Sequence, residues 1–140
     1  MYDDIQIEYY EIIKNKILLT RFESALGNVE KLLNYNPNNS MAHYYGGVCN
    51  FALGDYLNSV ECYLKSISCD VTNAKAYFNL GASYLMLKKY DQALINFAKS
   101  TIIFSKRKEI DNVKRCTHAI KVTQNERGIF NWKLFLYCFL

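Results

Sequence analysis

The sequence predicts an all-α fold in which helix-turn-helix hairpins stack side by side and one further helix closes the end. The first observation is an internal repeat with a period of about 34 residues, a length typical of two-helix units that bury their apolar faces by stacking on copies of themselves. The second is composition, since 51% of residues are hydrophobic and only one is proline. The later copy of the repeat has Tyr77, Leu80, Gly81, Tyr84, Tyr90, Ala93 and Phe97, and the earlier copy has His43, Gly46, Gly47, Asn50, Tyr56, Ser59 and Tyr63.

The first hairpin is expected over about residues 6–39. A fainter copy of the repeat carries Tyr9, Ile12, Ile13, Phe22, Ala25 and Val29. Thr20 and Glu23 have the spacing of a capping box, which predicts that they open the second helix of this hairpin. Because Ile13 stands where the later copies have glycine, we expect this hairpin to open slightly or to shift its crossing. The run from Pro37 to Ser40 ends the unit and caps the next one.

The second and third hairpins are expected over about residues 40–73 and 74–107. Gly54 and Asp55 form a helix stop followed by a helix cap. Lys88 and Lys89 hold the corresponding places one period later, so the third hairpin must turn without a left-handed glycine.

Small side chains recur where the two helices of a hairpin approach closely. We expect Gly47 to face Ser59 and Gly81 to face Ala93, because helix packing at about 8–9 Å requires small residues at the contact. The large residues of the repeat are then expected to fill the space between hairpins.

A capping helix is expected over about residues 106–123, opened by Ser105 and carrying one apolar and one charged stripe. Residues 1–127 therefore form a single predicted domain. Residues 1–105 carry nine Lys or Arg against ten Asp or Glu, whereas residues 106–140 carry eight against three. We interpret this positive charge as solvation of the capping helix rather than as a nucleic-acid site.

Residues 128–140 form a hydrophobic, aromatic tail that is shorter than the roughly 20 residues of a membrane-spanning helix. The favoured interpretation is that the tail folds back onto the stack. It can also lie in a membrane interface beside the basic helix, bind another chain, promote self-association, or be a gene-end artefact.

The motif aromatic-x2-Leu-Gly-x2-Tyr followed by Ala-x3-Phe, which runs from Tyr77 to Phe97, resembles the tetratricopeptide repeat (TPR) family. The resemblance covers about residues 6–107 and implies a right-handed superhelical stack whose first helices line a concave groove. In this family the groove usually holds an extended peptide or a partner helix. The resemblance places the following candidate partner-binding residues in the groove: Tyr10, Lys14, Met41, Tyr44, Tyr45, Val48, Phe51, Lys75, Phe78, Asn79 and Ala82.

Co-chaperones of this family grip a chaperone's terminal carboxylate with a clamp of lysine, asparagine and arginine side chains. At the corresponding places of this chain only Lys75 agrees, so we predict no such clamp. Lys75 and Asn79 are nevertheless placed to position a peptide backbone that the aromatic side chains then hold.

The sequence contains no phosphate-binding glycine loop, no H-E-x-x-H motif and no metal-spaced Cys/His cluster. His43 and His118 fall in different predicted helices, and His43 is expected to be a packed side chain. We therefore expect neither an enzyme nor a cofactor. The odd number of cysteines without a C-x-x-C pair favours a reducing, cytoplasmic compartment.

The sequence thus predicts an adaptor or scaffold that binds a mainly apolar peptide or helix of another protein. One alternative is an assembly chaperone that shields hydrophobic client segments, and another is a peripheral membrane protein that uses residues 106–123 and the tail. For the groove, we expect the double change Tyr44→Ala and Phe78→Ala to remove binding while leaving stability nearly unchanged.

Overall fold

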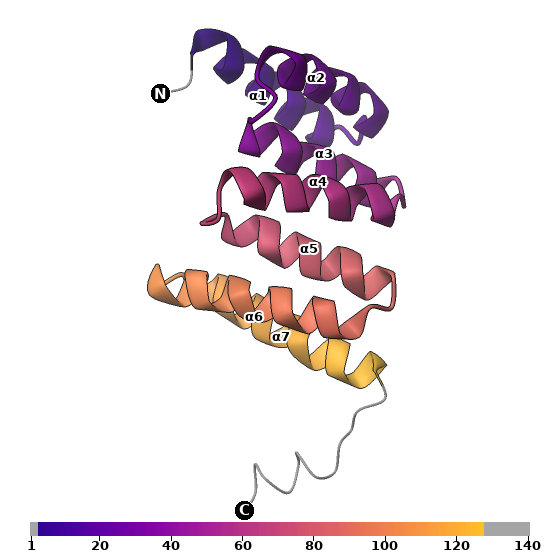
Figure 1. Cartoon of the computed structure of the whole chain (residues 1–140), viewed down its shortest axis with the longest axis vertical. Helices are drawn as coiled ribbons and strands as arrows, with labels where there is room; N and C mark the ends of the chain where they lie inside the picture. Colours follow the sequence, from indigo (N-terminus) through magenta and orange to yellow (C-terminus); the bar gives the residue numbers. More distant parts are fainter. Residues whose placement is uncertain (1–2, 128–140) are drawn as a thin grey trace, which may run out of the picture.

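The structure of the chain is a computed structural model that describes residues 3–127. Within this range the chain forms helices and no strand. The helices follow one another along the long axis of the molecule, with the N-terminal hairpin at one end and the last helix at the other (Figure 1). They are α1 (Asp4–Leu18), α2 (Phe22–Tyr35), α3 (Ser40–Ala52), α4 (Tyr56–Cys69), α5 (Ala74–Met86), α6 (Tyr90–Lys106) and α7 (Ile110–Glu126).

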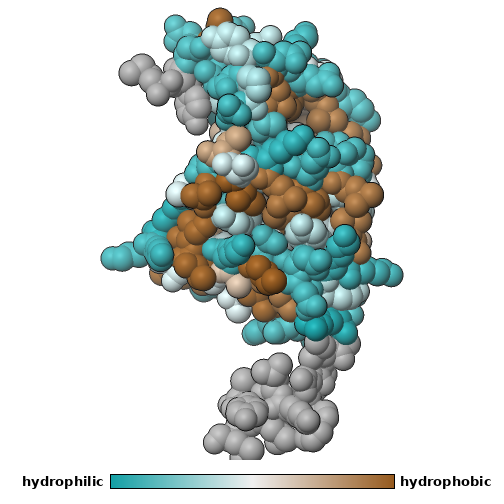
Figure 2. Space-filling model, viewed as in Figure 1, coloured by the Kyte–Doolittle hydropathy of each residue, from teal (hydrophilic) through white to brown (hydrophobic). Residues whose placement is uncertain are grey.

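The all-α stack predicted from the repeat is confirmed. Each hairpin packs its two helices together, and the second helix of one hairpin packs on the first helix of the next. A band of hydrophobic residues crosses the middle of the stack on the face shown in Figure 2. No helix in the described range is long and apolar enough to cross a membrane. The predicted tail, residues 128–140, lies outside the described residues.

Short polar side chains begin several of the helices. Asp3, Asn39, Asp55 and Asn73 each accept a hydrogen bond from a backbone N–H in the first turn of α1, α3, α4 and α5. Such caps satisfy N–H groups that have no partner inside the helix. The expected stop and cap at Gly54 and Asp55 is therefore confirmed, and Gly54 has a φ of 80°.

The predicted capping box at Thr20 and Glu23 is wrong. The residue before α2 is Arg21, whose side chain makes no capping hydrogen bond. Thr20 instead has a φ of 57° and occupies the left-handed position of the turn, which Gly54 fills one period later and Lys88, at 59°, fills in the third hairpin. Thr20 thus belongs to the turn and not to a helix cap, because each of the three hairpins reverses direction at this position of the repeat.

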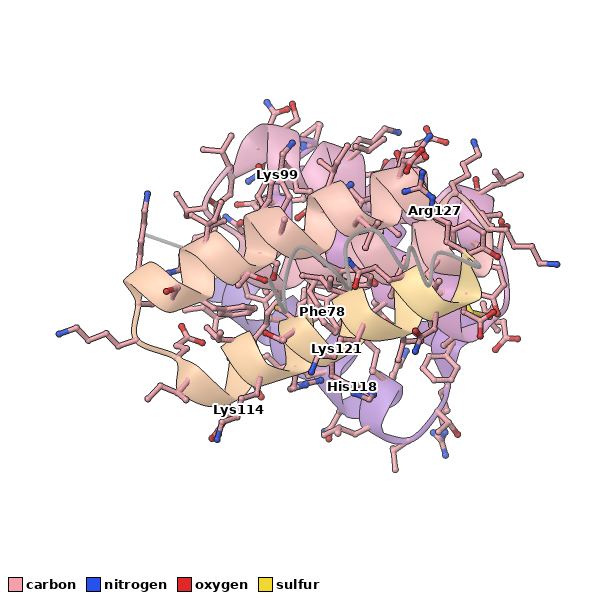
Figure 3. All side chains as sticks on the ribbon, turned by 90° about the horizontal axis from the view of Figure 1, so that it is seen from below. Phe78, Lys99, Lys114, His118, Lys121 and Arg127 are labelled. Carbon is pink, nitrogen blue, oxygen red and sulfur yellow. The ribbon has the colours of Figure 1, made fainter. Side chains whose placement is uncertain are left out.

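The predicted start of the capping helix is also wrong. α6 continues to Lys106, so Ser105 lies in its last turn and does not cap a new helix. Lys108 then adopts a φ of 59°, and α7 begins at Ile110. Viewed from this end of the stack, α7 lies beside α6 and carries Lys114, His118 and Lys121 (Figure 3).

The glycines of the repeat make room for aromatic rings of the second helix, and the expected contacts with Ser59 and Ala93 stay a prediction. A Cβ built on Gly47 would lie 2.5 Å from Cε1 of Tyr63, and one on Gly81 would lie 2.8 Å from the Phe97 ring. Real Cβ atoms do not approach other atoms so closely, so these positions require glycine. Each ring comes from the residue four positions after Ser59 or Ala93 on the second helix.

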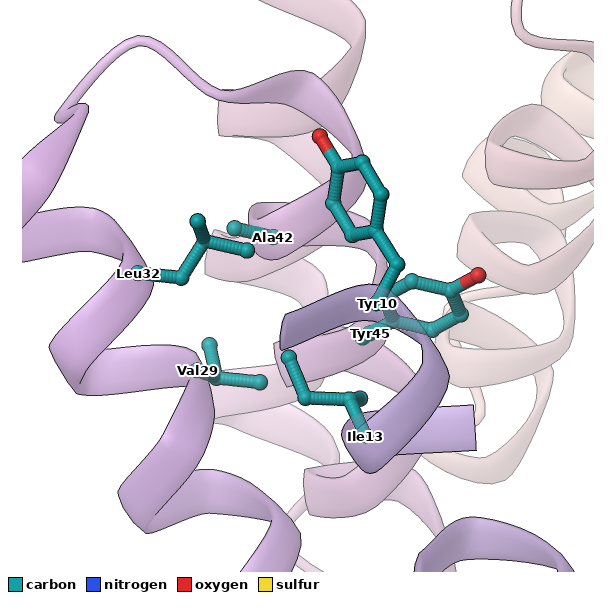
Figure 4. Close-up of a cluster of buried hydrophobic side chains, with 6 residues drawn as sticks. All are labelled: Tyr10, Ile13, Val29, Leu32, Ala42 and Tyr45. Carbon is teal, nitrogen blue, oxygen red and sulfur yellow. The ribbon is translucent and has the colours of Figure 1, made fainter. Parts of the chain in front are cut away.

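The first hairpin has no such glycine. Ile13 stands one period before Gly47, and Val29 stands one period before Tyr63. Both side chains are buried in one cluster and lie side by side (Figure 4). The isoleucine thus fills the volume that the aromatic ring occupies in the later hairpins.

Serine hydroxyls tie the two helices of the second and third hairpins together. Ser66 donates to the carbonyl oxygen of Ser40 at 2.9 Å, and Ser100 donates to that of Ala74 at 2.8 Å. Each bond joins the C-terminal half of the second helix to the first residue of its partner. In the first hairpin the corresponding residue is Leu32, which has no hydroxyl, so only the second and third hairpins form this bond.

Candidate partner-binding groove

Three adjoining cavities lie along the first helices of the second and third hairpins. The α5–α7 cavity has a volume of about 220 Å³, the α3–α5 cavity about 200 Å³ and the Met41 cavity about 450 Å³. Asn79 borders the first two, whereas Tyr44 and Lys75 border both the first and the third. Because they share walls, we treat the three cavities together as one groove.

The linings of the cavities combine apolar and polar side chains. The α5–α7 cavity is lined by Tyr44, Lys75, Phe78, Asn79, Phe104, Asn112 and Arg115. The α3–α5 cavity is lined by Val48, Phe51, Tyr63, Asn79 and Ala82. The Met41 cavity is lined by Met41, Tyr44, Tyr45, Asp70, Thr72, Asn73, Lys75 and Arg107.

Every candidate residue that the sequence placed in the groove from the second and third hairpins borders one of these cavities. The two candidates from the first hairpin, Tyr10 and Lys14, border none of the three. The structure thus brings the candidates of α3 and α5 together around these cavities, whereas Tyr10 of α1 packs against Tyr45 at 6.3 Å between ring centroids.

Tyr10 is a core residue, which corrects its placement as a groove anchor. It is 8% exposed and belongs to the buried cluster that also contains Ile13 and Tyr45 (Figure 4). Its hydroxyl donates to Asn39 Oδ1 at 3.0 Å. Lys14 lies on the surface, where its Nζ is 3.1 Å from a carboxylate oxygen of Glu11.

Tyr45 also contributes to packing, although it borders the Met41 cavity. Only 8% of its surface is exposed, and burial raises the pKa of its hydroxyl to about 12. Its ring meets that of Tyr44 edge to face at 5.6 Å. A largely buried ring offers one edge to a ligand and keeps most of its area in the core.

Tyr44 and Phe78 join the groove to the core. The Tyr44 ring lies 5.9 Å from that of Tyr63, and its hydroxyl accepts a hydrogen bond from Asn79 Nδ2 at 3.2 Å. The Phe78 ring lies 5.3 Å from that of Phe97. Both rings therefore also pack against the core, which argues against the expectation that replacing them leaves stability nearly unchanged.

Asn79 is the polar centre of the groove. It borders two cavities, and its side-chain amide donates to the Tyr44 hydroxyl and also hydrogen-bonds Tyr63. Its bond also fixes the orientation of the Tyr44 ring. Burial raises the pKa of Tyr44, with Asn79 and Arg115 acting in the opposite direction.

Sequence reasoning missed the groove residues of α6 and α7. Phe104, Asn112 and Arg115 complete the α5–α7 cavity, but the helix of Asn112 and Arg115 was interpreted only as a closing surface. A signal existed, because Asn112 stands one period after Phe78. α7 therefore occupies the place that the first helix of a fourth hairpin would take.

Two cations flank the α5–α7 cavity. The guanidinium of Arg115 lies 5.7 Å from the centroid of the Phe78 ring, a cation–π geometry. Lys75 borders the same cavity from α5. In the part of the chain that the structure describes, neither side chain forms a salt bridge.

Residues 3–127 contain no group of three or more His, Cys, Asp or Glu side chains placed to hold a metal ion. His43 Nε2 lies 2.9 Å from the carbonyl oxygen of Pro37. This contact gives the ring a local structural role at the junction of the first two hairpins.

Comparisons with known proteins identify the class to which this fold belongs. A profile described as tetratricopeptide repeat matches residues 62–95, which run from α4 into α6. The Hsp70-Hsp90 organising protein of Plasmodium falciparum is 30% identical over 107 residues, covering 71% of this chain and 18% of that protein. The chain spans less than a fifth of that relative. The chain belongs to the tetratricopeptide repeat family.

Solved structures share the whole arrangement of helices. PcrH in complex with the chaperone binding region of PopD has a TM-score of 0.84 at 15% identity, covering 91% of this chain and 96% of that one. The TPR2B domain of yeast Sti1, in a complex with pHsp70, has a TM-score of 0.83 at 12% identity, covering 87% and 98%. At these identities the likeness establishes the fold.

Proposed function

We propose that this protein is an adaptor that holds a mainly apolar segment of another protein in the groove formed by α3, α5 and α7. The observation that carries the proposal is the continuity of three cavities lined by Tyr44, Phe51 and Phe78. Aromatic side chains in concave sites bury a large area at a low cost in conformational entropy, and such residues dominate protein interfaces.

The groove is suited to binding because its side chains are held in place before a partner arrives. Tyr44 is fixed by Asn79 and by its contacts with Tyr45 and Tyr63. Phe51 is fixed by the Tyr56 ring at 5.2 Å. A preformed surface loses little side-chain entropy on association, which favours affinity.

Structures of the same fold support a protein partner. The PcrH and Sti1 structures are complexes with segments of PopD and of Hsp70. What supports the proposal is that a stack of this shape accommodates a segment of another protein.

An assembly chaperone is the second candidate, favoured by the mainly apolar α3–α5 cavity and by the PcrH structure, which covers nearly the whole of the described chain. A chaperone raises the soluble yield of its client on co-expression, whereas an adaptor does not change it. Measuring the solubility of the identified partner with and without this protein distinguishes the two roles.

We also propose that the protein has no catalytic activity and acts in a reducing, cytoplasmic compartment. Cys49, Cys62, Cys69 and Cys116 are all unpaired thiols, which suits such a compartment. The membrane-surface alternative depends largely on residues 128–140, which lie outside the described residues. Sedimentation with anionic vesicles, with and without those residues, tests that alternative.

The groove is tested by filling it. Ala82 borders the α3–α5 cavity and is half-buried, so Ala82→Arg places a long side chain in the groove without removing a core contact. Ala98, exposed on α6, provides the matched control Ala98→Arg. We expect a pull-down from native lysate to lose its partner with Ala82→Arg and to keep it with Ala98→Arg.

The comparison is valid only if both variants keep the circular dichroism spectrum and the melting temperature of the wild type. Equal capture of the same partner by both folded variants would show that binding does not use the groove. Replacing Ala82 tests the site better than the Tyr44 and Phe78 double change, because those two rings also pack against the core.

A further inference from the structure

The α5–α7 cavity differs from its neighbours in charge. Lys75 borders it from α5 and Arg115 from α7, and neither makes a salt bridge within residues 3–127. Asn79 and Asn112 bring side-chain amides to the same cavity. Cations and an amide N–H group that converge on one small space can donate hydrogen bonds to a carboxylate.

Apolar walls surround these polar groups. Phe78 and Phe104 line the cavity, and Phe104 is 4% exposed. The Arg115 side chain is exposed, and its guanidinium lies over the Phe78 ring at 5.7 Å. This contact limits the orientations of its N–H groups.

We propose that the α5–α7 cavity binds one acidic side chain, aspartate or glutamate, of a partner segment whose neighbouring residues are apolar. This inference rests on the proposed function, because it specifies the partner of the same groove. Lys75 and Arg115 bind the carboxylate, and Asn112 donates its second amide hydrogen to it.

The occupant is a side chain rather than a chain terminus because the cavity adjoins both other parts of the groove. It shares Tyr44 and Lys75 with the Met41 cavity and Asn79 with the α3–α5 cavity. A segment that fills those cavities continues past the α5–α7 cavity and presents a side chain to it.

Asn112 also bonds to an acidic side chain. Asn112 Nδ2 donates to Glu109 Oε2 at 2.6 Å, so this amide is oriented by an acidic neighbour. Glu109 is not among the residues that line the cavity. The charged side chains that line the cavity itself are Lys75 and Arg115.

The test uses three synthetic peptides and the full chain. The first peptide has acetylated and amidated ends and one glutamate flanked by leucine and phenylalanine. The second replaces the glutamate with glutamine, and the third keeps the glutamine but has a free terminal carboxylate. Binding is followed by amide chemical-shift changes, including those of Val48 and Ala82 in the α3–α5 cavity and of the Asn79 side chain.

We expect the glutamate peptide to bind at least about tenfold more tightly than the glutamine peptide, as is usual for hydrogen bonds to a charged group. We expect Lys75→Gln and Arg115→Gln to remove this preference. Lys114→Gln is the matched control, because Lys114 is exposed, does not line the cavity and lies apart from Phe78 at the outer edge of α7 (Figure 3).

The outcomes separate the inference from the function on which it rests. Equal binding of the two capped peptides, with shifts at Val48 and Ala82, would overturn the acidic site and leave the groove intact. Tight binding of the free-terminus peptide alone would also overturn it, since the site would then recognise a chain end. If none of the peptides shifts Val48, Ala82 or Asn79, both the site and the proposed groove fail.

Discussion

The first hairpin differs from the second and third in where it carries its bulky side chain. The first has Ile13 on α1 opposite Val29 on α2, whereas the later hairpins have glycine opposite an aromatic ring, Gly47 with Tyr63 and Gly81 with Phe97. The number of side-chain heavy atoms at the contact is similar, but the large group has moved from the first helix to the second. Packed interiors tolerate such exchanges when volume is conserved.

This exchange has a consequence for function. Tyr63 reaches across the glycine of its hairpin, contacts Tyr44 and forms one wall of the α3–α5 cavity. The Val29 side chain is too short to form such a cavity wall. Tyr10 and Tyr45 are buried in the cluster that contains Val29. The groove described above accordingly lies in the second and third hairpins.

The largest expected effect is that of Gly47→Ile. Its Cβ alone would lie 2.5 Å from the Tyr63 ring, so we expect the free energy of unfolding to fall by about 3 kcal/mol, at the upper end for overpacked cores. Adding Tyr63→Val recreates the pair of the first hairpin, and we expect it to restore at least about 1 kcal/mol. Urea unfolding of the wild type, the single variants and the double variant measures both effects.

Gly27→Ala is the matched control for this series. Gly27 lies in α2, and a Cβ built on it would meet nothing within 4 Å. Alanine there should stabilise the protein by up to about 1 kcal/mol through helix propensity. If the losses of unfolding free energy caused by Gly47→Ile and Tyr63→Val simply add in the double variant, the two side chains do not compensate for each other, and the proposed exchange of volume between the helices is wrong.

A smaller effect is expected at the cap between the first two hairpins. Asn39 caps α3 and also accepts from the Tyr10 hydroxyl and donates to Gln6 Oε1 at 2.7 Å. Asn73, one period later, caps α5 through the backbone N–H of Ala76. We expect Asn39→Ala to cost about 2–3 kcal/mol and Asn73→Ala about 1 kcal/mol, because only the first also disrupts a buried side-chain network.

Thermal and urea unfolding of the two alanine variants measure this difference directly. The two positions share the same helical role, so the comparison isolates the contribution of Gln6 and Tyr10. Equal losses would show that the buried network adds nothing to the cap.

The fold was predictable from the sequence because the recurring small and large side chains of the repeat indicate which helices pack together. The groove positions of α3 and α5 could also be predicted, since residues such as Tyr44 and Asn79 stand at fixed positions of the repeat relative to Gly47 and Gly81. The burial of Tyr10 was not, because it depends on Asn39 and Tyr45 in the next hairpin. The role of Arg115 was missed because α7 lacks the aromatic and glycine signals of the repeat.

The smallest expected effect concerns the turns inside the hairpins. Thr20, Gly54 and Lys88 hold the same left-handed position 34 residues apart, with φ values of 57°, 80° and 59°. This conformation costs a residue with a Cβ about 1–2 kcal/mol, and β-branched threonine is especially disfavoured. We therefore expect Thr20→Gly and Lys88→Gly each to raise the free energy of unfolding by up to about 1 kcal/mol, with the greater flexibility of glycine in the unfolded chain offsetting part of the gain. Gly54→Ala should lower it by about 1 kcal/mol. The same unfolding assay measures all three, and a loss of stability in Thr20→Gly would mean that the threonine side chain stabilises its turn by more than its backbone conformation costs.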